Sequence, residues 1–154
     1  MLEKPQRKIN RLKDYDYSQE NLYFVTLCIK NRESILGNIV GANCVRPQLF
    51  EIGIIVENEI KKLGNIYENI NITEYIIMPN HIHAIIEIGR TQFAPTLSRI
   101  IKQFKGSITK QIGYSIWQKS YYDHIIRNEK ELYKIIEYIK YNSLNWENDS
   151  NYNI

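Results

Sequence analysis

The segment 71–88, with the sequence NITEYIIMPNHIHAIIEI, decides how this chain folds. Two runs rich in isoleucine, Asn71–Met78 and His81–Ile88, flank the dipeptide Pro79-Asn80, and proline cannot donate a hydrogen bond to a strand ladder. Two strands joined by so short a turn run antiparallel. We therefore expect a mixed α+β domain with helices layered on its sheet, rather than a doubly wound parallel sheet.

Other elements are predicted from the spacing of apolar residues on either side of this segment. Leu22–Lys30 is rich in β-branched and aromatic residues and predicts a buried strand. Ile35–Val45 predicts a weaker strand, interrupted by glycines, as the partner arm of a hairpin. Gln48–Leu63 carries apolar residues at three- and four-residue spacing, so we expect an amphipathic helix there that stops at Gly64.

Two further helices are predicted, one after Pro95 and one near Asn128. The first has an apolar stripe, and the basic residues Arg99, Lys102 and Lys105 fall largely outside that stripe. The second begins with Asn128-x-x-Glu131, the pattern of a capping box with asparagine in place of serine or threonine.

Composition limits the class of protein. The chain has 154 residues, of which 44% are hydrophobic and 24% charged, and this favours one ordinary domain with its own core. No run approaches the roughly 18 to 20 apolar residues that span a bilayer, and the basic N-terminus lacks the apolar stretch of a secretory signal. Two cysteines are too few for a disulfide framework. We expect a cytoplasmic protein with no membrane partner.

The net charge of +3 is unevenly distributed. Residues 4–13 contain five basic side chains and no acid, and residues 90–127 contain seven basic side chains and one acid. Clustered cations gain free energy by displacing counterions from phosphates, which favours a nucleic-acid partner. Such clusters also occur as solvated faces, so charge alone leaves both interpretations open.

The pair His81 and His83 is a candidate metal site. Side chains alternate along a strand, so both rings project from one face, roughly 6 to 7 Å apart along the backbone, while Ile82, Ala84 and Ile86 take the other face. Two neutral imidazoles can share one metal ion, although ordinary histidines give the same pattern. A catalytic ion needs a further ligand, and with no other His or Cys cluster it would be an oxygen or amide group.

The third helix carries three tyrosines, of which Tyr138 is the candidate nucleophile. At about 100° per residue, Tyr141 points away from the buried stripe, whereas Tyr133 and Tyr138 flank it on opposite sides. Only Tyr138 has Asn142 one turn later on the same edge. Because the reference pKa of a phenol is about 10, such a nucleophile needs a nearby cation or base. A packing role for this ring is the alternative.

The motif Met78–Ile86, with the sequence MPNHIHAII, resembles the His-hydrophobic-His motif of the single-tyrosine HUH transposases, and most closely their REP-associated tyrosine transposase branch. Further segments match that family in its order along the chain, from about residue 10 to residue 146: Arg11-Leu12, Tyr15–Tyr17, Tyr23–Thr26, Ile116–Gln118, Tyr121–Arg127 and Tyr138–Asn142. One departure is Asn142-Ser143, where the family often has Asn-Pro.

This resemblance implies a ferredoxin-like antiparallel sheet with helices packed on it and the His-x-His motif on a central strand. It implies that His81 and His83, with Asn142, hold Mg²⁺ or Mn²⁺, and that Tyr138 attacks single-stranded DNA. Cleavage and rejoining would then pass through a 5′-phosphotyrosine. The domain would span residues 21–146, between a basic arm at 1–20 and a polar tail at 147–154.

The expected partner is single-stranded DNA with hairpin ends, in the nucleoid of the cytoplasm. Basic side chains are the candidates for contacts to the DNA backbone: Arg11, Arg99, Lys102, Lys105 and Arg127. Three aromatic side chains either stack on unpaired bases or fill the core: Trp117, Tyr121 and Tyr122. The resemblance leaves open whether the protein acts as a monomer or a homodimer, and whether the tyrosine serves its own subunit.

Three alternatives stay open at this point. The chain could be a nucleic-acid-binding domain of the same fold without chemistry, or a host-domesticated or inactive transposase. It could also be a zinc enzyme built on the histidine pair, although the sequence offers few further zinc ligands. Metal dependence and a cleavage product would separate these alternatives.

Overall fold

A computed structural model describes residues 21–41, 44–89 and 95–146 of the chain. The expected basic arm, with Arg11, and the expected polar tail lie outside the described residues. Along the described chain the elements are β1 (Asn21–Cys28), a 3₁₀ turn η1 (Lys30–Arg32), β2 (Gly37–Asn38), β3 (Gln48–Leu49), α1 (Glu51–Ile66), β4 (Ile70–Ile77), β5 (His81–Ile88), α2 (Leu97–Ile112), β6 (Tyr122–Ile126) and α3 (Glu129–Lys140).

The main sheet has four strands in the order β4-β5-β1-β6, and every neighbouring pair is antiparallel. The succession β1-α1-β4-β5-α2-β6 is the β-α-β-β-α-β arrangement of ferredoxin-like domains, which confirms the expected fold class. β5, which carries His81 and His83, is an inner strand between β4 and β1. Among the described helices, none is both long and apolar enough to cross a bilayer.

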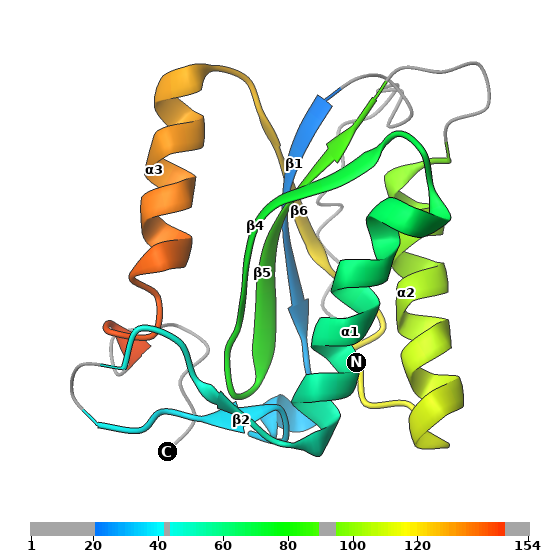
Figure 1. Cartoon of the computed structure of the whole chain (residues 1–154), viewed down its shortest axis with the longest axis vertical. Coiled ribbons are helices and arrows are strands. Elements are labelled where there is room, and N and C mark those ends of the chain that lie inside the picture. The colour runs from blue at the N-terminus through cyan, green and yellow to red at the C-terminus, as the bar shows by residue number, and fades with distance from the viewer. Residues whose placement is uncertain (1–20, 42–43, 90–94, 147–154) are drawn as a thin grey trace, which may run out of the picture.

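Helices cover the sheet on both faces. α1 and α2 lie against one face, and α3 lies alone against the other (Figure 1). The even-numbered apolar residues of β5 follow the predicted alternation, since Ile82, Ala84 and Ile86 belong to the core under α1 and α2. The smaller core under α3 has these buried members: Ile76, Met78, Ile85, Ile126 and Ile139. The sheet therefore separates two apolar layers.

The region before α1 differs from the sequence prediction. Among the described residues of the expected strand Ile35–Val45, only Gly37–Asn38 forms a strand, and its partner is Gln48–Leu49, which the apolar spacing predicts as part of the helix. The spacing of apolar residues within one segment does not predict a pairing with another segment about ten residues away. The helix also continues past Gly64 to Ile66, because the N–H of Tyr67 still donates to the carbonyl of Leu63. β6 was not predicted as a separate strand.

The predicted start of α3 is confirmed. The side-chain Oδ1 of Asn128 accepts a hydrogen bond from the N–H of Glu131 at 2.8 Å. α2 has an equivalent start at Thr96, whose Oγ1 accepts from the N–H of Arg99 at 3.2 Å, and it ends at Gly113 with a φ of 97°. These caps fix where both helices begin, and so fix which residues of α3 meet the sheet.

Gly53 permits the close approach of α1 to the loop before β2, and its replacement is expected to destabilise the fold. A Cβ at this position would lie 2.0 Å from the carbonyl oxygen of Leu36, a backbone atom that also accepts from the N–H of Phe50. We expect Gly53→Ala to lower the free energy of unfolding by about 2–3 kcal/mol, although alanine is the better helix former. Urea denaturation measures the change.

Gly106 supplies the matched control on α2. A Cβ there would meet nothing within 4 Å, and the position is exposed. Gly106→Ala should therefore raise the free energy of unfolding by about 0.5–1 kcal/mol, the ordinary helix preference for alanine. Equal effects of the two substitutions would contradict the role assigned to Gly53.

Candidate functional site

β5 directs two buried histidines toward α3. His81 and His83 are 0% and 3% exposed, and their Nε2 atoms lie 3.0 Å apart. Both rings are on the face of the sheet opposite Ile82, as expected from the strand alternation. The indole of Trp146 stacks on the His81 ring with centroids 6.0 Å apart, and Phe24 of β1 stacks on the His83 ring at 5.4 Å. Aromatic rings thus shield the pair from solvent.

Hydrogen bonds orient each imidazole through its other nitrogen. The Nδ1 of His81 lies 2.7 Å from Oδ1 of Asn80, and because an amide oxygen only accepts, His81 donates from Nδ1, so that its neutral form has a lone pair on Nε2. The Nδ1 of His83 lies 2.9 Å from the hydroxyl of Thr26 on β1. A hydroxyl can donate or accept, so Thr26 can serve either tautomer of His83.

The electrostatic environment keeps His83 neutral. Burial lowers the pKa of His83 well below its usual value, and the positive charge that His81 can carry lowers it further. The neutral imidazole is the form that binds a metal. The ring is therefore in its metal-binding state at neutral pH.

The histidine pair fits a divalent metal ion. If both rings carry their proton on Nδ1, two lone pairs face each other across 3.0 Å, an arrangement that a cation between them would stabilise. When two ligand atoms each lie about 2.1 Å from an ion and the angle between the two bonds is about 90°, the two atoms are about 3.0 Å from each other. Within the described residues no group of three or more His, Cys, Asp and Glu side chains could hold a metal. Further ligands would be amide or water oxygens.

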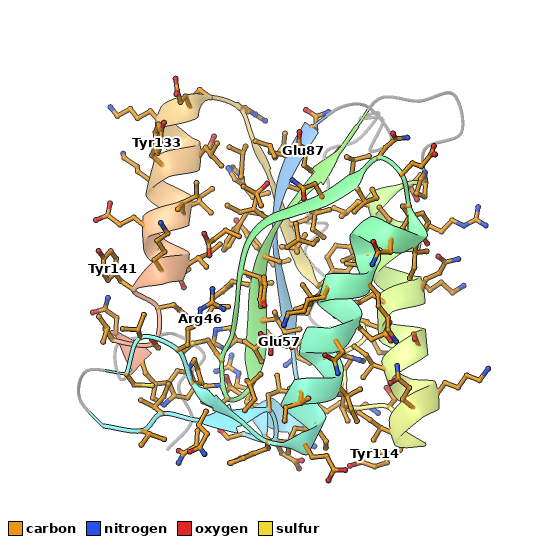
Figure 2. The ribbon with its side chains drawn as sticks, in the orientation of Figure 1. Arg46, Glu57, Glu87, Tyr114, Tyr133 and Tyr141 are labelled. Carbon is orange, nitrogen blue, oxygen red and sulfur yellow. The ribbon has the colours of Figure 1, made fainter. Side chains whose placement is uncertain are left out.

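α3 places the phenol of Tyr138 beside this pair. Its hydroxyl lies 3.4 Å from Nε2 of His83, and the two rings have centroids 5.2 Å apart. The Tyr138 side chain is 47% exposed, so one side of it contacts the histidine and the other faces solvent. Tyr133 of the same helix and Tyr141, the residue just after it, point outward (Figure 2) and are 62% and 52% exposed.

The C-terminal end of α3 is anchored by Ser143. Its Oγ lies 2.7 Å from the carbonyl of Cys44 and 2.6 Å from that of Val45, so the hydroxyl can donate to this loop, a contact that proline could not make. The preceding Asn142 is 2% exposed. A pocket of about 400 Å³ opens beside this end of the helix and is lined by Lys134, Glu137, Tyr138, Tyr141, Asn142 and Asn145.

Of the basic residues expected to contact DNA, the four that the structure describes do not gather at this site. Arg99 and Lys102 are exposed on α2, which covers the other face of the sheet (Figure 1). Lys105 donates to the carbonyls of Gln118 and Ser120, at 2.9 and 3.4 Å, and burial lowers its pKa to about 8. Arg127 is exposed between β6 and α3. Their contact with DNA stays a prediction.

The structure shows which of the three aromatic residues fill the core and which is exposed. Trp117 is 3% exposed and belongs to the core under α1 and α2, where its ring lies 6.0 Å from that of Phe104. Tyr121 packs against the same core. Tyr122 is 47% exposed on β6. Of the three, Tyr122 is therefore the one most available to a ligand.

Sequence reasoning missed several residues of the site. Asn80 and Thr26 orient the histidines, Trp146 covers His81, and Lys134 places a cation in the pocket beside Tyr138. Asn80 adjoins the motif and Lys134 precedes Tyr138 by one helical turn, so spacing could have found both. Thr26 is 57 residues from His83, and only the pairing of β1 with β5 brings them together.

Thr26 should tune metal binding through the His83 ring. Thr26→Val keeps the shape of the side chain and removes the partner of Nδ1, so we expect the affinity for Mn²⁺ to fall about 10- to 100-fold. Isothermal titration calorimetry measures the affinity. Thr73→Val, at an exposed position of β4, is the matched control and should leave it unchanged. Equal Mn²⁺ affinity in both variants would show that Thr26 does not orient the ring.

Known proteins are similar to this chain in sequence. No protein-family model matches the chain. An uncharacterised protein of Haemophilus influenzae is 35% identical over 170 aligned residues, covering 95% of this chain and 93% of the relative. A second protein of the same organism, named "Putative REP-associated tyrosine transposase", is 30% identical over 79 residues, covering 43% of this chain and 45% of the relative.

Two solved structures share the fold. A REP-associated tyrosine transposase bound to a REP hairpin superposes with a TM-score of 0.66 at 22% identity, covering 86% of this chain and 72% of the other. A transposase-like protein of Deinococcus radiodurans, itself named only as a possible transposase, superposes with a TM-score of 0.50 at 16% identity, covering 84% of this chain and 94% of the other. At these identities the likeness concerns the fold.

Proposed function

We propose that this chain, which is similar to REP-associated tyrosine transposases in its fold and over part of its sequence, cleaves and rejoins single-stranded DNA through a covalent 5′-phosphotyrosine. The observation that carries this proposal is the hydroxyl of Tyr138, 3.4 Å from Nε2 of His83 in a half-exposed setting. A phenol that solvent and a DNA strand can reach, beside a site that fits a divalent cation, has the two features that a tyrosine nucleophile requires.

The reaction is a transfer of one phosphoryl group. The Oη of Tyr138 attacks the scissile phosphorus, the bond from phosphorus to the 3′ oxygen breaks, and the phosphate stays on Tyr138 as a 5′-phosphotyrosine. The phenol proton passes to solvent, and the departing oxygen takes up a proton to become a free 3′-hydroxyl. Attack by another 3′-hydroxyl reverses the step and joins strands. The covalent link conserves the phosphodiester, so no nucleoside triphosphate is consumed.

His81, His83 and Asn142 would hold the cofactor, Mg²⁺ or Mn²⁺. When bound, the ion supplies charge that polarises the scissile phosphate and favours the phenolate. The chain's own contribution is orientation, because Asn80 and Thr26 hold the imidazoles and Ser143 holds the end of the helix that bears Tyr138. Imidazole ligands are better suited to Mn²⁺ than to Mg²⁺, so Mn²⁺ should serve at least as well.

The proposed substrate is a single strand that ends in a hairpin. This choice is supported by the relative of known structure that is bound to a REP hairpin. Tyr138 lies beside His83 of the same chain, which supports the proposal that one subunit supplies the tyrosine and the histidine pair.

The direct experiment is incubation with a hairpin-bearing single strand and Mn²⁺, followed by denaturing gel electrophoresis. Separate substrates carry a label at the 5′ or the 3′ end. A 5′-phosphotyrosine leaves the 3′-terminal label on the protein and releases the 5′-terminal label in a product with a free 3′-hydroxyl. Attachment of the 5′-terminal label would contradict the proposed polarity. DNA binding that is insensitive to EDTA, with no adduct on any tested strand, would favour a non-catalytic binding domain.

A further inference from the structure

A cluster of aromatic rings extends from the histidine pair across β1 to β6. The ring of Phe24 stacks on His83, and it meets the rings of Tyr138 and Tyr122 edge to face, with centroids 6.2 and 6.3 Å apart. Strand pairing explains the alignment, since Thr26 of β1 lies opposite both His83 of β5 and Tyr122 of β6. Tyr122 is therefore two strand spacings, roughly 10 Å, from His83.

The members of this cluster differ in exposure. His83 is buried, and Phe24 is partly buried between the rings that it contacts. Tyr122 is 47% exposed, the same fraction as Tyr138. Its contact with Phe24 is edge to face, so Phe24 can engage at most one face of the Tyr122 ring. An exposed aromatic ring that contacts Phe24, as Tyr138 also does, is thus available on the sheet.

An unpaired base is the ligand whose chemistry fits this position. A base is joined to its phosphate through one sugar, so a phosphate held at Tyr138 must have a base close by. Aromatic side chains bind unpaired bases by stacking, whichever base is present, because every base has a π-face. The pocket beside Tyr138 also contains Lys134, whose charge suits a neighbouring phosphate.

We propose that Tyr122, supported by Phe24, is a stacking site for the unpaired base next to the phosphate that Tyr138 attacks. This inference rests on the proposed function, because the phosphate at Tyr138 defines which base reaches Tyr122. Stacking tolerates any base. The site therefore positions the strand relative to Tyr138 and contributes little to the choice of the DNA sequence that is cut. Phe24 is a positioning residue, and Tyr122 is a binding residue.

The test measures stacking without cleavage. A short oligothymidylate carrying one 2-aminopurine is titrated in EDTA with Tyr138→Phe protein, and the fluorescence of 2-aminopurine is recorded. We expect the protein to quench this fluorescence, and we expect Tyr122→Leu in the same background to abolish quenching and weaken binding about 5- to 100-fold. Tyr122→Phe keeps the ring and should retain both properties.

Tyr114→Leu supplies the matched control. Tyr114 is 58% exposed just beyond the end of α2, on the side of the molecule away from α3 (Figure 2). Its replacement should leave quenching and affinity unchanged. Circular dichroism and thermal melting of every variant verify that the fold is retained, and a Tyr122→Ser variant repeats the test if the leucine variant does not fold.

Two results would overturn the stacking proposal. Quenching by Tyr122→Leu that equals the quenching by the Tyr138→Phe parent would exclude a base on Tyr122. Loss of quenching in Tyr122→Phe would assign the effect to the hydroxyl rather than to stacking. Neither result bears on the covalent adduct, which is measured with protein that retains Tyr138. Conversely, a wild-type protein that forms no adduct but quenches through Tyr122 would reject the proposed cleavage and retain the stacking site.

Discussion

Tyr138→Phe is expected to lower formation of the covalent DNA adduct by roughly a thousandfold or more, the scale seen when a nucleophile is removed. The substitution removes one oxygen atom. It keeps the ring that contacts His83 and Phe24 at centroid distances of 5.2 and 6.2 Å. The affinity for single-stranded DNA should therefore change little, because stacking and charge are unchanged. Denaturing gels measure the adduct, and fluorescence anisotropy measures the affinity.

The same helix offers a control substitution of identical chemistry. Tyr133→Phe removes a hydroxyl from an exposed ring on the outer side of α3 (Figure 2). This variant should form the adduct at the wild-type rate. If the Tyr138→Phe protein forms as much adduct as the Tyr133→Phe protein, another residue is the nucleophile, and mass spectrometry of the digested adduct identifies it.

Replacing the histidine pair should abolish metal binding, the second large effect. His81→Ala with His83→Ala removes both facing Nε2 atoms, 3.0 Å apart. The loss of Mn²⁺ affinity should exceed the roughly 10- to 100-fold that follows from changing an orienting neighbour such as Thr26. Electron paramagnetic resonance of free Mn²⁺ measures binding directly. Adduct formation should disappear with it, because the phosphate and the phenol lose the charge of the ion.

His124 provides the control for that experiment. It is the remaining histidine of the chain, it lies on β6, and its Nε2 contacts the carboxylate of Glu131 rather than the pair on β5. His124→Gln should retain both Mn²⁺ binding and adduct formation. Mn²⁺ binding that survives loss of His81 and His83 but is lost with His124 would place the metal elsewhere in the molecule.

The fold could be predicted where local patterns dominate. The β4-β5 hairpin follows from two apolar runs around Pro79-Asn80, and the start of α3 follows from Asn128, because turns and caps depend on residues close together in sequence. The start of α1 could not be predicted in this way. Gln48–Leu49 pairs with Gly37–Asn38, and a backbone ladder between separated segments overrides the helical spacing of the side chains.

For the candidate site too, local patterns predict some features and only the tertiary structure shows the others. The sequence alone determined that His81 and His83 share a strand face, because side chains alternate, and that Tyr138 flanks the apolar stripe of its helix with Asn142 one turn later. Only the tertiary structure decided that Nε2 faces Nε2, that Thr26 reaches His83, and that basic α2 lies across the sheet from Tyr138. Periodicity assigns a side chain to a face, whereas distances between residues far apart in sequence depend on strand order and on which face of the sheet each helix covers.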